Sequence, residues 1–304
     1  MEKIAVVTDT GSNLSFEEAK ELGIYLLPLQ ITIDDTTYQD TLEISTQDIY
    51  KELAQGKMPK TSMVAYQRIY DLFEELKKEY DTVFAVPLTN GLSTNASTMQ
   101  SIARELEMNV HVIDLYSTCE LEKHVAIWIK KLVDKNKSSE EILSIIQPVI
   151  DDSNSLILVK DLQHLKRGGR LTPMAATLAG LLKIYPVLHI NKSTEGRIDV
   201  LNKVRTEKRA DAYAMDTIID KIDVQHTHIY IIHSDFLEGA NHFKKCFIEK
   251  GVPEKNIHIN FISSVIAVHT GLRCIAIQYI REENERHGNK KHFNHNEKWR
   301  SNQG

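Results

Sequence analysis

The chain has 304 residues and a formal net charge of -5. This length predicts two domains, or one large domain, with enough interior for a cavity, and the acidic balance gives no electrostatic case for nucleic-acid binding. The three cysteines, Cys119, Cys246 and Cys274, are odd in number and widely spaced. They indicate neither a disulfide framework nor a metal site, as expected in a reducing compartment.

The start of the chain lacks the features of a secretion signal. The stretch EKIAVVTD, residues 2–9, enters a strand without a basic region followed by an apolar one. No apolar run in the sequence is long enough to span a bilayer. We therefore expect a soluble cytoplasmic protein.

Short β-branched runs alternate with amphipathic segments through the first half. Strands are expected at residues 4–8, 25–33, 82–87 and 110–114, and helices at 16–22, 64–78, 94–107, 120–135 and 139–150. This alternation predicts a parallel, Rossmann-like sheet covered by helices on both faces.

The second half predicts another α/β unit. The polar stretch DDSNS, residues 151–155, favours a domain boundary, so that the expected domains are residues 1–153 and 154–280. Strands are expected near 156–159, 186–190, 198–203, 228–233, 257–262 and 274–279, and helices at 206–222 and 236–250. The turn NKSTEGRI between two strands resembles a hairpin and predicts a mixed sheet. Residues 281–304 read as a polar, solvated tail.

The tetrapeptide DTGS at residues 9–12 raises the possibility of an aspartic protease. That chemistry needs two carboxylates sharing a proton, and the sequence has no second Asp-Thr/Ser-Gly copy. The following segment SFEEAKELG is typical of a helix, whereas such proteases are all-β. The protease interpretation is therefore rejected.

Three loops at the expected carboxyl ends of strands are rich in hydroxyl groups. They are TDTGSNLS after the first strand, PKTSMVAY at 59–66 and PLTNGLSTNASTMQS at 87–101. In the third, Ser93 or Thr94 could cap a helix and leave backbone N–H groups for an anion. The phosphate-binding, metalloprotease and nucleophile-elbow motifs are absent from the sequence. Neutral donors without a matching catalytic group suggest that an anion is held rather than transformed.

Residues 158–190 contain the densest group of distinctive sequence features in the second half. The pair Gly168-Gly169 permits a tight turn or a close backbone approach, with Arg170 just beyond it. The run AATLAGLLKI sets small residues among leucines, which indicates either close helix packing or space for a slender ligand. Further on, His269 lies between two apolar segments; it is an interior histidine or, beside an anion site, a hydrogen-bond donor.

Together these segments resemble the DegV family of bacterial fatty-acid-binding proteins, the carrier subunits of fatty acid kinase. The likeness covers nearly the whole chain to about Tyr279. It begins with VVTDTGSNLSFEEAKELGIYLLPLQITIDDTTYQD and continues through PKTS and GLS. The most specific stretches are LKRGGRLTPMAATLAGLLKIYPVL and VLNKVRTEKRA, and HTG at 269–271 completes the likeness.

The resemblance implies two α/β domains with a long-chain fatty acid, such as palmitate, stearate or oleate, extended in a tunnel between them. Carried over by motif, the carboxylate-binding residues are Thr61, Ser62, Ser93 and His269, with Arg170 as a supporting charge. The family's role is to present the carboxylate to an ATP-dependent kinase subunit, which makes an acyl phosphate for phospholipid synthesis. This implies a carrier with no cofactor, no metal and no catalysis of its own, and it allows transient contact with a membrane surface.

Two departures from the family pattern affect the predicted head-group site. After Ser93 the family usually has Gly-Thr, where this chain has TN at 94–95. After the HTG motif the family often continues Pro-Gly, where this chain has Leu272 and Arg273, and Arg273 could add a cation.

Other interpretations remain open at this point. The basic residues Lys203, Arg205, Lys208 and Arg209 form either a solvated edge or a docking surface for an acidic partner. An enzyme acting on a small acidic substrate, with Ser93 as nucleophile and His269 as base, is the principal alternative. A regulatory module that senses lipid is a third hypothesis.

Overall fold

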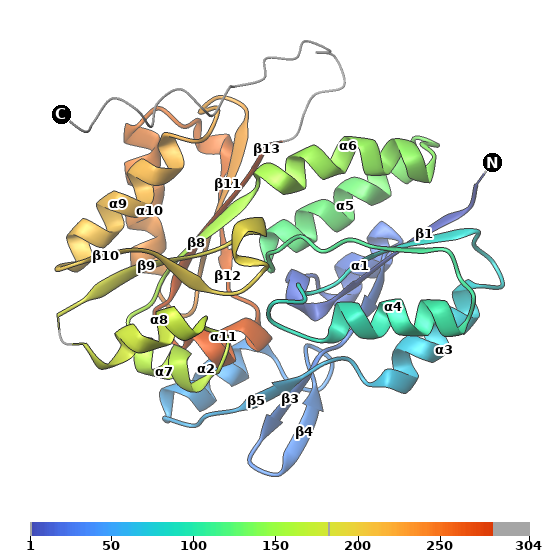
Figure 1. Ribbon diagram of the computed structural model, residues 1–304, viewed down its shortest axis with the longest axis horizontal. Helices are drawn as coiled ribbons and strands as arrows, with labels where there is room; N and C mark the ends of the chain where they lie inside the picture. The colour runs from blue at the N-terminus through green and yellow to red at the C-terminus, as the bar shows by residue number, and fades with distance from the viewer. Residues whose placement is uncertain (1, 182, 282–304) are drawn as a thin grey trace.

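The first half of the chain forms a four-stranded parallel sheet. The computed structural model describes residues 2–181 and 183–281, and its first sheet has the order β2-β1-β6-β7. The strands are β1 (Ile4–Asp9), β2 (Tyr25–Leu27), β6 (Thr82–Val86) and β7 (Val110–Val112). Every neighbouring pair is parallel, which confirms the predicted sheet (Figure 1).

Helices cover both faces of this sheet because β1 is apolar on both sides. Ala5 and Val7 join a core with α3 (Tyr66–Leu76) and α4 (Asn95–Glu105). Ile4 and Val6 point the other way and join a core with α1 (Phe16–Leu22), α5 (Glu120–Asp134) and α6 (Ser139–Asp152). Successive strand side chains alternate between faces, so this continuous apolar run is the pattern of a strand buried on both.

Residues 25–33 form two strands in different sheets, which corrects the single strand expected from the sequence. After β2, strand β3 (Gln30–Ile33) pairs with β4 (Thr36–Gln39) and β5 (Lys60–Ser62) in a small antiparallel sheet. Pro28 lies at the break; its fixed φ and missing N–H interrupt strand pairing. The small sheet places β5, and with it Thr61, beside the second half of the chain.

The second half forms a mixed sheet of order β10-β9-β8-β13-β11-β12. The strands are β8 (Asn154–Leu158), β9 (Tyr185–Ile190), β10 (Asp199–Val204), β11 (Thr227–His233), β12 (Ile257–Phe261) and β13 (Ile275–Arg281). β11 and β12 pair in parallel, whereas β13 is antiparallel to both β8 and β11. β9 and β10 form the predicted hairpin, so the mixed sheet is confirmed.

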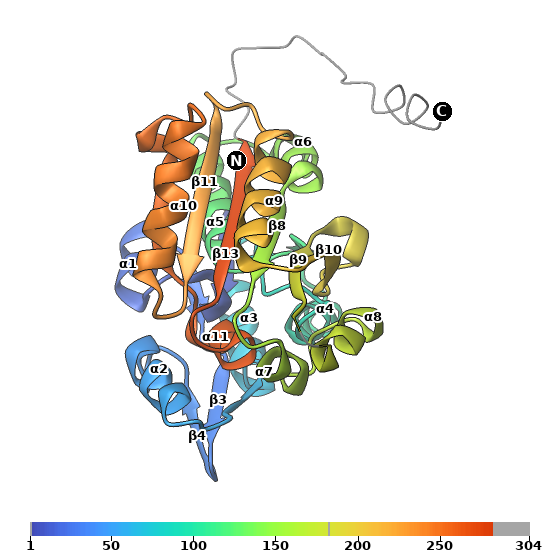
Figure 2. The same cartoon turned by 90° about the vertical axis from the view of Figure 1, so that its left-hand side faces the viewer.

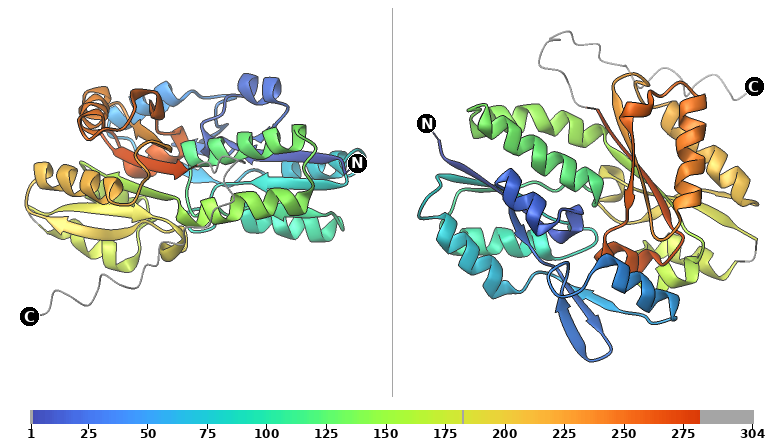
Figure 3. Two further views of the ribbon diagram at one scale, coloured as in Figure 1. Left: turned by 90° about the horizontal axis from the view of Figure 1, so that it is seen from above. Right: turned by 180° about the vertical axis from the view of Figure 1, so that it is seen from behind.

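The two faces of the second sheet have different neighbours. Helices α9 (Glu207–Ile219) and α10 (Leu237–Glu249) cover one face, as Figure 2 shows. On the other face, Ile157, Leu188 and Ile232 share a buried cluster with Val7 and Phe73 of the first half. Helices α5 and α6 run side by side and contact β13 (Figure 3). One continuous core therefore joins the two halves.

Four helices near the joint are additional to the predicted ones. They are α2 (Thr46–Ala54), α7 (Leu162–Arg167), α8 (Pro173–Thr177) and α11 (Ser264–Thr270). The small-residue run after α8 continues as a 3-10 turn at Leu178–Gly180. Apart from α2, these helices are shorter than two turns, too short to show a helical period.

The division of the chain at 153/154 stays a prediction, although α6 ends at Asp152 and β8 begins at Asn154. The predicted tail lies outside the described residues except for Arg281, which ends β13. Within residues 2–181 and 183–281, no helix is both long and apolar enough to cross a membrane.

Candidate functional site

A cavity of about 430 Å³ lies between the two halves of the molecule. This volume falls within the range of small-molecule sites. The first half contributes β5 and the loop between β6 and α4, and the second half contributes the segment after α7, the residues just before β10, and α11. The apolar walls include Leu29, Met63, Leu92, Leu171, Ile198 and Ile266.

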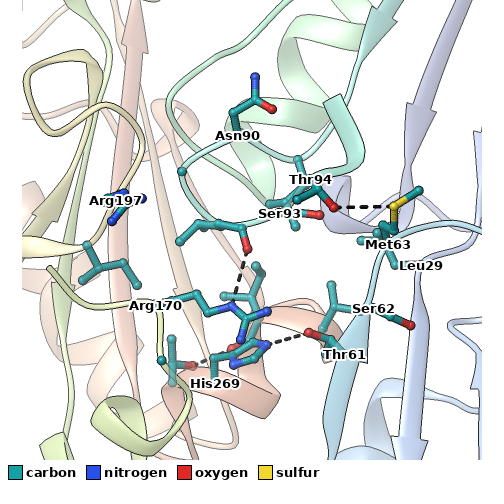
Figure 4. Close-up of a pocket in the computed structure, with 18 of the residues that line it drawn as sticks. Leu29, Thr61, Ser62, Met63, Asn90, Ser93, Thr94, Arg170, Arg197 and His269 are labelled. Atoms are coloured by element: carbon teal, nitrogen blue, oxygen red, sulfur yellow. Dashed lines mark hydrogen bonds between the residues drawn. The ribbon is translucent and has the colours of Figure 1, made fainter. Parts of the chain in front are cut away.

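Thr61 and His269 meet across the joint at one end of this cavity. The Thr61 Oγ1 and His269 Nε2 atoms are 2.7 Å apart (Figure 4). His269 Nδ1 is 3.1 Å from the carbonyl oxygen of Gly168, which can only accept. The imidazole is therefore protonated at Nδ1, and its Nε2 accepts the hydrogen bond that Thr61 donates.

His269 is held in its neutral form. Burial lowers its pKa to about 3, and the nearby positive charge of Arg170 acts in the same direction. The hydrogen bond to Gly168 opposes this shift without cancelling it. Because Nε2 is occupied by Thr61, the imidazole is arranged as an anchor for the hydroxyl rather than as a base for Ser93.

The Gly168-Gly169 pair brings the main chain close to His269, as the sequence allowed. A Cβ on Gly168 would lie 3.0 Å from His269 Nδ1, and Gly169 has φ of 73°, where glycine is favoured. The next residue, Arg170, donates from Nη1 to Gly168 O at 2.8 Å and from Nε to Leu92 O at 3.4 Å. Arg170 therefore spans the gap between the two halves.

Ser93 lies at the start of α4, on the opposite side of the cavity from the Gly168 turn. Its Oγ accepts from the backbone N–H of Asn95 at 3.2 Å, which leaves its own O–H free to donate into the cavity. The Thr94 hydroxyl contacts the sulfur of Met63 at 3.5 Å instead of capping the helix. Of the two caps considered from the sequence, Ser93 is the one that bonds the helix terminus.

The charge of the cavity lining is positive. Arg170 and Arg197 both line it, and neither forms an ion pair with a described carboxylate. Among the described lining residues there is no Asp or Glu. Burial lowers the pKa of Arg170, yet a guanidinium keeps its proton at any physiological pH. The site is built to attract an anion.

A smaller, deeper cavity of about 30 Å³ lies beyond the first. The two share four wall residues, Leu92, Ile198, Ile266 and Thr270. Its other walls come from the joint core and include Cys119, Ile157, Ile190, Ile232, Ile262 and Ala276. The two cavities are thus neighbours, and the side chains of their shared, mostly apolar wall separate them.

The structure brings together most of the residues predicted from the sequence. Thr61, Ser62, Ser93, Arg170 and His269 all line the large cavity. The Ser62 hydroxyl, however, donates to Gln30 at 3.1 Å and points away from His269 (Figure 4).

The predicted docking residues and Arg273 lie elsewhere. Lys203, Arg205 and Arg209 are exposed at the end of β10 and the start of α9, and none makes an ion pair with another described residue. The Arg273 guanidinium lies over the ring of Phe236, 4.1 Å from its centroid, and lines a different pocket. It therefore adds no cation to the head-group site.

Sequence reasoning missed Arg197 and the structural role of α11. Arg197 lies in the hairpin turn NKSTEGRI, which has no local pattern that distinguishes a ligand-binding arginine from a solvated one.

Among the described residues, no cluster of three or more His, Cys, Asp or Glu side chains could hold a metal ion.

Comparisons with known proteins cover nearly the whole chain. A family model described as "Uncharacterised protein, DegV family" matches residues 3–282. A DegV domain-containing protein of Halalkalibacterium halodurans is 31% identical over 289 residues, covering 93% of this chain and 100% of the relative.

Two solved structures are similar in fold and sequence. One, a fatty acid binding DegV family protein from Streptococcus agalactiae, has a TM-score of 0.86 and 28% identity over 93% of this chain and 100% of its own. The other, DegV from Bacillus subtilis, a fatty acid binding protein, has a TM-score of 0.80 and 26% identity, covering 92% and 100%.

Proposed function

The chain belongs to the DegV family, and on that premise we propose that it binds a long-chain fatty acid in the cavity between its two halves. The carboxylate would lie among Thr61, Ser93, Arg170 and His269, and the acyl chain would extend toward the deeper cavity. The observation that carries the proposal is a cavity lined by two unpaired arginines and by no described carboxylate, with an apolar wall leading inward.

The head-group chemistry supports a bound carboxylate. A desolvated carboxylate needs hydrogen bonds or a cation, and Ser93 O–H and the Arg170 guanidinium offer both. Thr61 donates to His269 in this structure, so it would serve the ligand after its hydroxyl turns. Ser62 would contribute only after a rotation away from Gln30.

The apolar shared wall and the cavity behind it support a long chain rather than a short acid. Burial of about 14 methylenes contributes on the order of 11 kcal/mol, comparable to what a membrane offers the same chain. The side chains of the shared wall, among them Leu92 and Ile266, would have to separate for the acyl chain to reach the deeper cavity. The relatives from S. agalactiae and B. subtilis are described as fatty acid binding, which supports the same ligand class.

The carrier role is the finer part of this proposal. The protein would present the carboxylate to an ATP-dependent kinase subunit in the cytoplasm, with no chemistry of its own, and would exchange ligand at a membrane surface. The exposed cations Lys203, Arg205 and Arg209 would dock an acidic surface of that subunit. Charge reversal at Arg205 should weaken complex formation; unchanged binding and turnover with the kinase would exclude this surface.

Lipid extracted from protein purified under native conditions tests the ligand. Mass spectrometry should detect a fatty acid near equimolar amount, and delipidated protein should bind a fluorescent fatty acid that oleate displaces. If no acyl chain co-purifies and none binds on addition, the proposal fails.

A pair of ligands separates head-group recognition from chain burial. Arg170→Gln should weaken binding of oleate but leave the binding of the corresponding uncharged alcohol unchanged. A charge-assisted hydrogen bond is involved, so we expect a loss of about tenfold or more for the acid. An equal loss for acid and alcohol would mean that Arg170 acts on the fold and not on the carboxylate.

A further inference from the structure

Two buried carboxyl groups lie next to the loop that carries Ser93 but do not line the cavity. Asp9 ends β1, in the segment DTGS, and Glu122 lies in the first turn of α5. Both residues are 0% exposed, and neither lines the large cavity. A buried acid of this kind must be protonated or fully hydrogen-bonded.

The two carboxyl groups are close neighbours around Gly11. A Cβ placed on Gly11 would lie 2.8 Å from Asp9 Oδ1 and 3.1 Å from Glu122 Oε2. A glycine here leaves the space in which the two acids approach each other. Glu122 Oε2 is buried and has no hydrogen-bond partner among the described residues, so it faces this shared space unpaired.

The hydrogen bonds decide which acid keeps the proton. Asp9 accepts from Gly11 N at 2.8 Å, Leu88 N at 2.9 Å and Asn95 Nδ2 at 2.6 Å, which favours its ionised form. Glu122 accepts only from Thr8 Oγ1, at 3.2 Å, and its Oε2 has no other described donor. Burial raises the pKa of both acids, and the hydrogen bonds to Asp9 oppose that rise, whereas the charge of Asp9 adds to burial and raises the pKa of Glu122 well above its usual range. A protonated Glu122 Oε2 that donates to Asp9 satisfies both groups.

Asn95 connects this pair to the ligand site. Its side chain donates to Asp9, and its backbone N–H donates to the Ser93 hydroxyl. Leu88, which also donates to Asp9, lines the cavity itself. Two hydrogen bonds, both made by Asn95, therefore link the Asp9 carboxylate to the Ser93 hydroxyl, so the position of this hydroxyl depends on Asp9.

We propose that Asp9 and Glu122 are positioning residues for Ser93: the protonated Glu122 orients the Asp9 carboxylate, and Asp9 fixes Asn95 and Leu88 so that Ser93 presents its hydroxyl to the ligand. This inference rests on the proposed function, since its effect is read as ligand affinity. It also gives the segment DTGS a role that does not involve catalysis by its aspartate.

Other titratable groups face the pair and belong in any pH experiment. Asp40 interacts with Asp9 from the connection after β4, and Cys119 interacts with Glu122 from the start of α5. Burial raises the pKa of Asp40 to about 6 and that of Cys119 to about 11. At about pH 8, Asp40 is therefore ionised and Cys119 is neutral.

The conservative substitution Glu122→Gln tests the hydrogen bond itself. The amide donates as a protonated acid does, so oleate affinity should stay within about twofold of wild type, whereas Glu122→Ala should weaken it about tenfold. Infrared spectra near pH 8 should contain a protonated-carboxyl band in wild type that Glu122→Gln removes. An affinity loss in Glu122→Gln equal to that in Glu122→Ala, or no such band, would overturn the proposal.

A double-mutant cycle tests the route through Asn95 and does not depend on Asp9 variants that fail to fold. Asn95→Ala and Ser93→Ala should each weaken oleate binding, and the double variant should lose little more than the larger single loss. Additive losses would exclude the proposed route. If wild-type protein binds no fatty acid, the proposed function fails, while the infrared measurement still decides whether Glu122 carries the proton.

Discussion

The main chains of Gly91 and Gly196 touch across the joint between the two halves. A Cβ on Gly91 would lie 2.1 Å from the carbonyl carbon and oxygen of Gly196. Gly91 belongs to the loop that carries Ser93, and Gly196 to the hairpin turn that precedes Arg197. Any side chain at Gly91 must therefore push the two sides of the cavity apart.

Gly91→Ala should destabilise the protein by about 1–3 kcal/mol and speed the release of bound fatty acid, because overpacking at the joint displaces the Ser93 loop. Gly180→Ala is the matched control, since a Cβ on Gly180 would meet no atom within 4 Å. Urea unfolding and ligand dissociation kinetics measure the two effects. Equal behaviour of the two variants would show that the joint accommodates a methyl group.

Thr61→Val should weaken fatty-acid binding about fivefold to tenfold. The valine keeps the shape of the side chain but removes the hydroxyl that would turn from His269 to the carboxylate, a hydrogen bond of about 1–1.5 kcal/mol. Thr61→Ser, which keeps the hydroxyl, should bind nearly as wild type. Displacement of a fluorescent fatty acid is the measurement, and a serine variant as weak as the valine variant would contradict the assignment.

The buried His269 should make the protein less stable as the pH falls. Its pKa is about 3 in the folded protein, below the ordinary value of 6.5, so between these values the unfolded chain binds more protons. Its contribution to the free energy of unfolding is present above pH 6.5 and is lost as the pH falls toward about 3. The loss amounts to at most about 5 kcal/mol. His269→Gln should flatten this part of the stability profile measured by urea unfolding. A profile identical to that of wild type would show that His269 is protonated without cost.

Asp40 should have the opposite effect. Burial raises its pKa from 3.8 to about 6, so between these values the folded protein binds more protons. Its contribution to the free energy of unfolding is present below pH 3.8 and is lost as the pH rises through about 6. The loss amounts to about 3 kcal/mol. Asp40→Asn should remove this decline in unfolding free energy, and the exposed Asp35→Asn should not. A decline that persists in Asp40→Asn would place the titration elsewhere.

Local sequence predicted the elements whose burial pattern repeats along the chain. The alternation of β-branched runs with amphipathic segments indicated a parallel sheet covered on both faces, and SFEEAKELG indicated the helix α1, which begins with a Ser15–Glu18 capping box and is followed by Gly23. The hairpin of β9 and β10 followed from its turn residues. These features depend on contacts between residues close in sequence.

The same reasoning failed where the decisive contact is distant. The run YLLPLQITI reads as one strand, and its division at Pro28 into two sheets depends on partners at Val7 and Thr61. Helix α11 has seven residues, as α1 has, but it has no capping box that marks its start. Its place is decided by packing against α2 and α7.

The amino-acid sequence by itself determined the family, the two types of sheet and the candidates Thr61, Ser93, Arg170 and His269, because motifs and hydrophobic periods are properties of neighbouring residues. Only the tertiary structure decided that Thr61 donates to His269, 208 positions away. It also decided that Arg197 joins the cavity while Arg273 stacks on Phe236. A side chain's charge and hydrogen-bonding capacity follow from the residue type. Its partner and its burial depend on which distant segments the fold brings together.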